Sequence, residues 1–505
     1  MDKIKGVLNN KNFIYALIAL FSLLLACLSK NYDYDLYARL IVGEHFFKTG
    51  WITYQDFLSY TPTHLWYDHE WGSSVVFYAF FKAFGNFGLI LVQAITMFFT
   101  TFFIIKTQKL QKHAYPTSLI FILFFLILFS HQNPSIVRCH MFSFMFFSML
   151  LYFLEKTRLQ NSNLIWLMLP ITIIWNNLHG GIVSGLGIIF LYFIGELLTR
   201  RPWKKYLGVL ILSTPLLCIN PYGIDYLQFL ISANTKNRYY VTEWWTVFAQ
   251  RHVVYYYPLF LTSVFTVFIA LFNAISKKKF NLTKILILVV TTTLGIIHVK
   301  LLSLPLIVLS ALFYNEIISL INKKSLRFLN KLACVLMIIS IVLIPYTKPT
   351  LARTDATKFP VLEVEFLKIN KIEGNLLTLF GLGSYVSYKL YPQNLIYMDG
   401  RYEEVYYDEE FNNLVHYEKV DFPNWDNVLK NYPTRILMPQ INSHIYNFLK
   451  KNQDWIEIYK GLLCGIFVSK NDLLSNKKFI TPPLDKNYYI SREFENFGKF
   501  GEVKE

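Results

Sequence analysis

The sequence predicts an α-helical polytopic membrane protein with about eleven transmembrane helices, followed by a C-terminal extracytoplasmic α/β domain. The 505 residues are 54% hydrophobic and 16% charged, with a mean hydropathy of +0.35, which excludes an ordinary soluble enzyme or a disordered chain. Apolar stretches of about 15 to 20 residues, the length of a bilayer-spanning helix, recur from Phe13 to about Tyr346. We therefore predict a membrane domain over residues 1–348 and a second domain over 349–505.

Each predicted span ends where an apolar run meets polar or charged residues. The spans are 13–29, 88–105, 117–130, 139–154, 164–178, 181–198, 207–220, 254–273, 285–299, 301–318 and 332–346. A cleavable signal peptide is the alternative for the first one, because a basic stretch precedes it. However, Cys27-Leu28-Ser29 is a poor cleavage site, and removing this helix would invert the charge pattern of all later loops.

Basic residues gather in alternate loops, and this predicts the orientation of the chain. With the N-terminus in the cytoplasm, every inside loop is basic and the tail is outside. Residues 349–505 contain 19 Lys/Arg and 21 Asp/Glu, so the net charge of +16 belongs to the membrane part. The charge therefore reports topology in a lipid bilayer, and no nucleic-acid partner is expected.

The first outer loop, residues 30–87, is polar, acidic and aromatic at once. Apolar residues after Asp35 fall on one helical face, which predicts an interfacial helix that Gly50 breaks. A second amphipathic segment, Ser73–Phe84, precedes the next span. Acidic side chains at a membrane surface are costly unless they are solvated or paired, so the cluster favours a functional site over a solvated loop. Its members are Asp33, Asp35, Asp56, Asp68 and Glu70.

The tail alternates short apolar runs with helical segments, which predicts an α/β domain. A helix is expected over 360–370, after a Thr/Pro linker. The expected strands are 375–380, 394–398, 434–438 and two runs within 455–469, and further helices are expected over 408–419 and 443–451. Five scattered cysteines show no metal-like spacing, so neither disulfides nor a zinc site is predicted.

Several short motifs occur in a fixed order along the chain. They are Asp33-Tyr34-Asp35-Leu36-Tyr37, Asp56-Phe57-Leu58-Ser59-Tyr60-Thr61-Pro62, Trp66-Tyr67-Asp68-His69-Glu70-Trp71, Arg138-Cys139-His140, Asn177-Leu178-His179-Gly180-Gly181, Asn220-Pro221-Tyr222-Gly223, Glu243-Trp244-Trp245, Gly381-Leu382-Gly383-Ser384-Tyr385 and Tyr397-Met398-Asp399-Gly400-Arg401. With these motifs the chain resembles the polytopic GT-C glycosyltransferases, a superfamily that includes protein O-mannosyltransferases and aminoarabinose transferases. The tail motifs resemble a bacterial branch, which implies the inner (plasma) membrane. Positions 37 and 39 hold Tyr and Arg, where related sequences often have Trp and His.

The resemblance implies an inverting transfer of a sugar from a polyprenyl-phosphate donor to a glycan, lipid or protein acceptor at the outer face. An acceptor hydroxyl needs a carboxylate to take its proton. By its position after the first span Asp35 is the expected base, and Asp33 is the alternative. The leaving phosphate needs positive charge, for which Arg138, His179 and Lys300 lie at or near outer helix ends.

These three cations also have structural interpretations. Lys300 can snorkel to the interface, and His179 can cap a helix turn. Arg251-His252 is a further basic pair, typical of an interfacial anchor. Supporting or acceptor-binding roles are expected for the remaining polar candidates, which are Asp56, Asp68, His69, Glu70 and Glu243.

No cofactor is firmly predicted. The Asp33-x-Asp35 spacing is a weak alternative site for Mg²⁺ or Mn²⁺, which prefer hard oxygen ligands, although relatives that use lipid-phosphate sugars generally work without metal. Two other functions stay open. A transporter or flippase of lipid-linked saccharides would need a polar path through the helices, and mid-span charges are nearly absent. A non-catalytic cell-envelope assembly protein would work through its tail.

Overall fold

A computed structural model describes residues 11–28, 33–111, 117–130, 136–235, 241–249, 281–347, 356–472 and 477–482, with isolated residues in 257–272 and at 474. The chain divides into two compact units. Unit 1 comprises residues 1–29 and 86–351, and unit 2 comprises residues 30–85 and 352–505. The predicted first outer loop therefore belongs, up to Gly85, to the same unit as the tail.

Unit 1 is helical in its described residues. Its α-helices are α2 (Lys11–Leu28), α5 (Asn86–Gln108), α6 (Leu119–Ser130), α7 (His140–Gln160), α8 (Met168–Leu178), α9 (Ile182–Leu198), α10 (Lys204–Leu216), α11 (Asp225–Thr235), α13 (Leu282–Ile297), α14 (Ser303–Leu312), α15 (Tyr314–Ile318) and α16 (Lys323–Val342). Short 3₁₀ turns are η2 (Leu164–Leu167), η3 (Thr242–Trp244), η4 (Val299–Leu301) and η5 (Ile344–Thr347).

Three described helices, α2, α5 and α16, are long and apolar enough to cross a membrane, and several shorter apolar helices accompany them. Helices occupy the predicted spans wherever these are described, but most of the expected span 254–273 lies outside the described residues, as does Arg251-His252. The total of eleven spans therefore stays a prediction.

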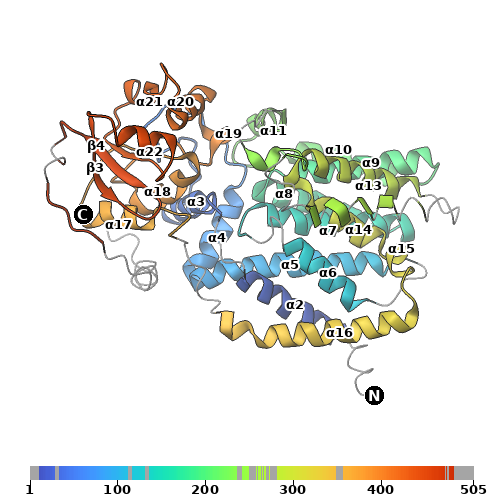
Figure 1. Cartoon of the computed structure of the whole chain (residues 1–505). Coiled ribbons are helices and arrows are strands. Elements are labelled where there is room, and N and C mark those ends of the chain that lie inside the picture. The colour runs from blue at the N-terminus through green and yellow to red at the C-terminus, as the bar shows by residue number, and fades with distance from the viewer. Residues whose placement is uncertain are drawn as a thin grey trace. The chain divides into compact units, whose positions relative to one another are not determined.

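The helices of unit 1 pack closely along their lengths (Figure 1). Helix α5 contacts α2 and α7, and α16 contacts α2 and α6. Helices α9 and α13 approach closely at Gly195, where an added Cβ would lie 2.8 Å from the Cα of Thr283. The Thr283 hydroxyl donates a 2.7 Å hydrogen bond to Glu196 of α9. Side-chain caps begin two of the helices, since Asn281 accepts from Lys284 N and Asn322 from Ser325 N.

Unit 2 combines helices with a small mixed sheet. Its α-helices are α3 (Leu36–Thr49), α4 (Trp71–Phe84), α17 (Val361–Ile369), α18 (Gly383–Leu390), α19 (Tyr402–Val405), α20 (Asp408–Lys419), α21 (Asn427–Lys430) and α22 (His444–Leu449), with a 3₁₀ turn η6 (Phe380–Leu382). The sheet has the order β1-β2-β4-β3, from β1 (Leu376–Thr378), β2 (Ile436–Met438), β4 (Gly465–Ser469) and β3 (Trp455–Lys460). Strands β1 and β2 are parallel, with Leu377 opposite Leu437, and the other pairs are antiparallel.

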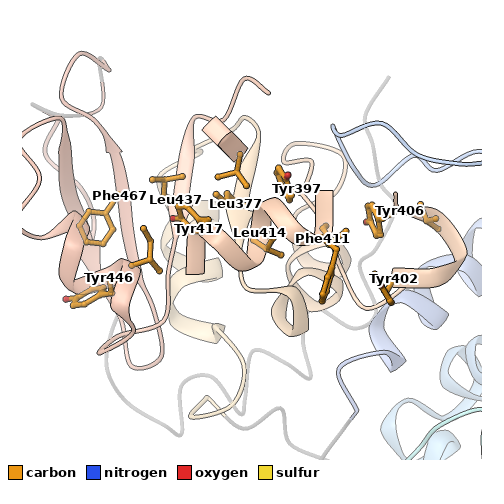
Figure 2. Packing of buried hydrophobic residues seen from close by; sticks show 14 of the residues in the cluster. Leu377, Tyr397, Tyr402, Tyr406, Phe411, Leu414, Tyr417, Leu437, Tyr446 and Phe467 are labelled. Atoms are coloured by element: carbon orange, nitrogen blue, oxygen red, sulfur yellow. The ribbon is translucent and has the colours of Figure 1, made fainter. Parts of the chain in front are cut away.

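Residues 33–85 are built into unit 2 by backbone hydrogen bonds. Tyr60 N donates to Ile396 O at 3.1 Å, and Ile396 N donates to Leu58 O at 3.0 Å. Val42 and Trp66 belong to the same buried cluster as residues of the tail, several of which Figure 2 shows: Leu377, Tyr397, Tyr402, Tyr406, Phe411, Leu414, Tyr417, Leu437, Tyr446 and Phe467. Burial of this apolar surface stabilises both segments together.

Two local expectations are wrong. The predicted interfacial helix forms as α3, but all residues from Leu36 to Gly43 are buried, because α3 packs between α4 and α18 inside unit 2. The expected strand 394–398 is reduced to single bridges of Ile396 with Ser59 and with Leu376. This segment turns at once into the Asp399-Gly400-Arg401 loop and does not extend along its neighbours.

Candidate functional site

In unit 1, three predicted site residues that are far apart in sequence form one ion-pair cluster. Arg138 Nη1 lies 2.6 Å from Glu243 Oε2, and Lys300 Nζ lies 3.1 Å from Glu243 Oε1. Each of the three side chains keeps about a fifth of its surface exposed. Against the effect of burial, the two cations hold the pKa of Glu243 well below its usual range. The cluster therefore carries two positive charges and one negative charge on side chains that are partly exposed.

Backbone contacts hold the Glu243 segment against the segment that carries Lys300. Val299 N donates to Trp245 O at 3.1 Å, and Val247 N donates to Ile296 O at 2.9 Å. The Lys300 ammonium also lies 5.2 Å from the centre of the Trp244 ring, a cation–π distance. The Glu243-Trp244-Trp245 motif thus supplies both a carboxylate and an aromatic surface to Lys300.

His179 lies at the end of α8, in a network with α7. Trp175 Nε1 donates to the Ser143 hydroxyl at 2.7 Å, and Ser143 Oγ lies 2.8 Å from His179 Nδ1. Gly181 N donates to the same Nδ1 at 2.9 Å, so this nitrogen is an acceptor and the ring proton is on Nε2. The predicted capping role of His179 is therefore observed, and Nε2–H is in addition a donor group.

His140, the first residue of α7, was not among the predicted site residues. It is 4% exposed, and neither ring nitrogen has a hydrogen-bond partner among the described residues. Buried polar atoms without partners are uncommon. His140 interacts electrostatically with Arg138, His179, Lys300 and Glu243, so it belongs to the same cluster. The sequence could have identified His140 as a site residue, because it belongs to the Arg138-Cys139-His140 motif.

In unit 2, the predicted base Asp35 immediately precedes α3. Its backbone N–H donates to Asp33 Oδ1 at 3.2 Å, and Asp33 is buried. Asp35 lies beside the loop Asp399-Gly400-Arg401, because a Cβ at Gly400 would overlap Asp35 Oδ1 and lie 3.8 Å from the Ser384 hydroxyl. Three of the sequence motifs therefore meet around Asp35.

One turn into α3, Arg39 is the centre of a buried ion-pair network. It pairs with Asp68, and its Nη2 lies 3.2 Å from Glu404 Oε2. Glu404 also accepts from Trp66 Nε1 at 2.9 Å and lies 3.1 Å from His69 Nδ1. Although burial alone would have the opposite effects, these partners lower the pKa of Glu404 and raise that of His69 to about 9. His69 is therefore a cation at neutral pH.

A second network surrounds Arg401. Its Nε lies 2.8 Å from Asp399, and its Nη1 lies 2.6 Å from Asp56. Arg401 also lies 4.6 Å from the Trp66 ring centre and donates to the Tyr406 hydroxyl at 3.1 Å. Burial raises the pKa of Asp56, but Arg401 outweighs it and holds that pKa low. The ion pair between Asp56 and Arg401 thus connects residues 33–85 to the tail.

One group of described residues has the donor atoms for a metal ion. Ligand atoms of His69, Glu70 and Glu404 lie within 4.8 Å of one another. Arg39 already contacts both carboxylates, with its Nε 3.7 Å from Glu70 Oε2, and a protonated His69 is a poor metal ligand. The present geometry is therefore that of an ion-pair network. Asp33 and Asp35, the weak alternative metal site predicted from the sequence, do not belong to this group of three residues.

The predicted residues thus fall into two sets, one in each unit. Unit 1 brings together Arg138, Glu243 and Lys300, with His179 and His140 coupled to them. Unit 2 holds Asp33, Asp35, Asp56, Asp68, His69 and Glu70. The partners of the acidic residues, Arg39, Arg401 and Glu404, were not predicted from the sequence. Arg39 carried a signal, its departure from the superfamily pattern, whereas no local pattern singled out Glu404.

Solved structures with a similar fold are known. ArnT from Cupriavidus metallidurans bound to undecaprenyl phosphate matches with a TM-score of 0.50 and 13% sequence identity, over 92% of this chain and 99% of that chain. The apo state of the same ArnT matches with the same score and identity, over 90% of this chain and 97% of that chain. The chain has an ArnT-like fold.

This likeness agrees with the predicted GT-C-like fold. At 13% identity it shows the fold alone. No protein-family model and no curated protein matches the sequence. Membership of the superfamily and the branch within it therefore stay predictions.

Proposed function

We propose that this protein is a membrane glycosyltransferase that moves a sugar from a polyprenyl-phosphate donor to an acceptor at the outer face of the membrane. The observation that carries the proposal is the cluster of Arg138, Glu243 and Lys300 within an ArnT-like fold. Cations at partly exposed sites are the groups that bind and stabilise a leaving phosphate. The ArnT of similar fold binds undecaprenyl phosphate, which supports the same donor class here.

In the proposed reaction an acceptor hydroxyl attacks the anomeric carbon from the side opposite the phosphate, so that the configuration inverts. A new carbon–oxygen bond forms, and Asp35 takes the hydroxyl proton. The bond between the anomeric carbon and the phosphate oxygen breaks, and its electron pair leaves with the phosphate. The polyprenyl phosphate gains negative charge, which Arg138 and Lys300 offset while His179 Nε2–H donates a hydrogen bond.

A panel of radiolabelled polyprenyl-phosphate sugars tests the proposal, with purified protein in lipid nanodiscs and release of the sugar as the readout. We expect one donor to be consumed, and we expect Asp35→Asn to abolish turnover while donor binding is retained. Loss of turnover in Asp33→Asn alone would move the base to Asp33. No turnover with any donor would favour the transporter or assembly functions, and equal turnover in all three proteins would assign the base to another residue.

A further inference from the structure

We infer that Glu243 is an internal competitor for phosphate, which a phosphate ligand must displace from Arg138 and Lys300. This inference rests on the proposed function. Each carboxylate oxygen of Glu243 pairs with a different cation, at 2.6 Å to Arg138 and at 3.1 Å to Lys300. Two oxygens of one phosphate group would make the same pair of contacts. The carboxylate and the phosphate therefore require the same donors.

The side chain of Glu243 can leave these donors without disturbing its backbone segment. The hydrogen bonds of its carboxylate go to Arg138 and Lys300. The segment itself is held through other residues, by the carbonyl of Trp245 and the amide of Val247. A change of the Glu243 rotamer therefore breaks both of its ion pairs while the contacts of Trp245 and Val247 remain.

Charge decides which phosphate competes best. The pKa of Glu243 is held low by its two partners, so the competing carboxylate is ionised at neutral pH. A phosphodiester donor carries one negative charge, like Glu243 itself, whereas a phosphate monoester product carries nearly two. The product phosphate therefore displaces Glu243 more readily than the donor does, and competition by Glu243 weakens the binding of both.

Binding of a short-chain prenyl phosphate tests the inference in nanodiscs. The probes are farnesyl phosphate, inorganic phosphate and uncharged farnesol. We expect Glu243→Gln, which keeps the shape and removes the charge, to bind farnesyl phosphate about tenfold more tightly than wild type. Glu243→Asp keeps the carboxylate, so its affinity should stay within about threefold of wild type. Farnesol binding should be equal in all proteins.

Asp225→Asn is the matched control for long-range charge. Asp225 is an exposed carboxylate in the first turn of α11 in the same unit, and its neutralisation should change the affinity less than threefold. A tenfold gain in farnesyl phosphate affinity in this control as well would overturn the inference. The loss of any negative charge in the unit would then explain the effect of both variants. Equal or weaker binding by Glu243→Gln would also overturn it, since Glu243 would then orient the cations.

The remaining arms separate this inference from the proposed function. Arg138→Gln should abolish farnesyl phosphate binding, which locates the phosphate at the cluster. If wild type and every variant fail to bind any phosphate probe, the proposed donor site itself is refuted. If Glu243→Gln binds both farnesyl phosphate and inorganic phosphate more tightly, the cluster recognises the phosphate group alone. If only the affinity for farnesyl phosphate rises, the ligand is a prenyl lipid phosphate.

Discussion

The carboxylate of Asp35 lies directly against the α-carbon of Gly400, where any side chain larger than hydrogen would overlap it. The overlapping atom is the end of a side chain and not backbone, so the conflict is relieved by moving the carboxylate of Asp35. Gly400 is therefore a positioning residue for the proposed base, contributed by a loop more than 360 positions later in the chain.

Gly400→Ala should separate activity from stability. We expect transfer to fall about 100-fold, because a shift of about 1 Å in a reacting group has an effect of this size. The free energy of unfolding should change by less than about 1 kcal/mol, since only a side-chain rotamer moves. The assay is release of labelled sugar, together with a thermal melt.

Gly381→Ala is the control for this variant. Its added Cβ would meet only the Tyr34 ring at 3.9 Å, an ordinary contact, so full activity is expected. Wild-type activity in Gly400→Ala would show that the position of Asp35 does not limit the reaction.

Glu404→Gln should destabilise unit 2 by about 3 kcal/mol or more, because it leaves Arg39 and His69 buried beside a neutral group. Cys464 is fully buried in this unit, so heat-induced labelling of its thiol, followed by peptide mass spectrometry, reports unfolding there. Lys430→Met removes an exposed pair with Asp426 and should cost less than about 1 kcal/mol. Equal midpoints for the two variants would contradict the structural role of Glu404.

The stability of unit 2 should fall between pH 6.5 and pH 9. The pKa of His69 is about 9 in the folded protein, against an ordinary value of 6.5. A raised histidine pKa stabilises the fold fully below the unfolded value, and this contribution is lost as pH rises through the folded value. The expected loss is on the order of 3 kcal/mol.

Thermal melts across this pH range, read by tryptophan emission, measure the loss. His69→Gln should remove most of the slope above about pH 7, because glutamine does not titrate. Below that pH, Glu418 of the same unit also contributes, since burial raises its pKa to about 7. The difference between wild type and variant at each pH cancels general effects of pH on the membrane unit. A slope that survives the substitution would assign the titration to another group.

Gly195→Ala should weaken the packing of α9 against α13 by about 1–3 kcal/mol. The added Cβ would meet the backbone of Thr283 at 2.8 Å, and the helices must separate at the hydrogen bond from Thr283 to Glu196. Gly187 in the same helix has nothing within 4 Å of an added Cβ. Its change to Ala should therefore stabilise the helix slightly. Thermal aggregation in detergent compares the two, and equal melting temperatures would refute the close approach.

Helices and strands set by local pattern were predictable from the sequence. Helix α20 matches the expected 408–419, and strands β1, β2, β3 and β4 fall within the expected runs. The helices of unit 1 followed from apolar length, whereas the phosphate-binding roles of Arg138 and Lys300 stay predictions. In each case the signal lies within about 20 neighbouring residues.

Long-range partners were not predictable. Arg39 and Glu404 are 365 positions apart. No sequence pattern around an acidic residue in a tail helix indicates which residue it pairs with. The acidic loop looked like a membrane-surface site because its countercharges, Arg39 and Arg401, were not counted as its neighbours. The burial of α3 was missed for the same reason, since α18 covers it and lies in the tail.

The shared core of residues 33–85 and the tail also fixes an order of events during synthesis. Val42 and Trp66 are made early, whereas Leu377 and Phe467, members of the same core, follow after the whole helical unit. At about 5–20 residues per second, the intervening stretch of about 270 residues takes roughly 15–50 s to translate. During that time, residues 33–85 cannot pack against the tail residues that complete their hydrophobic core. Assembly of the proposed base and of its supporting loop is therefore among the last steps in the biogenesis of this protein.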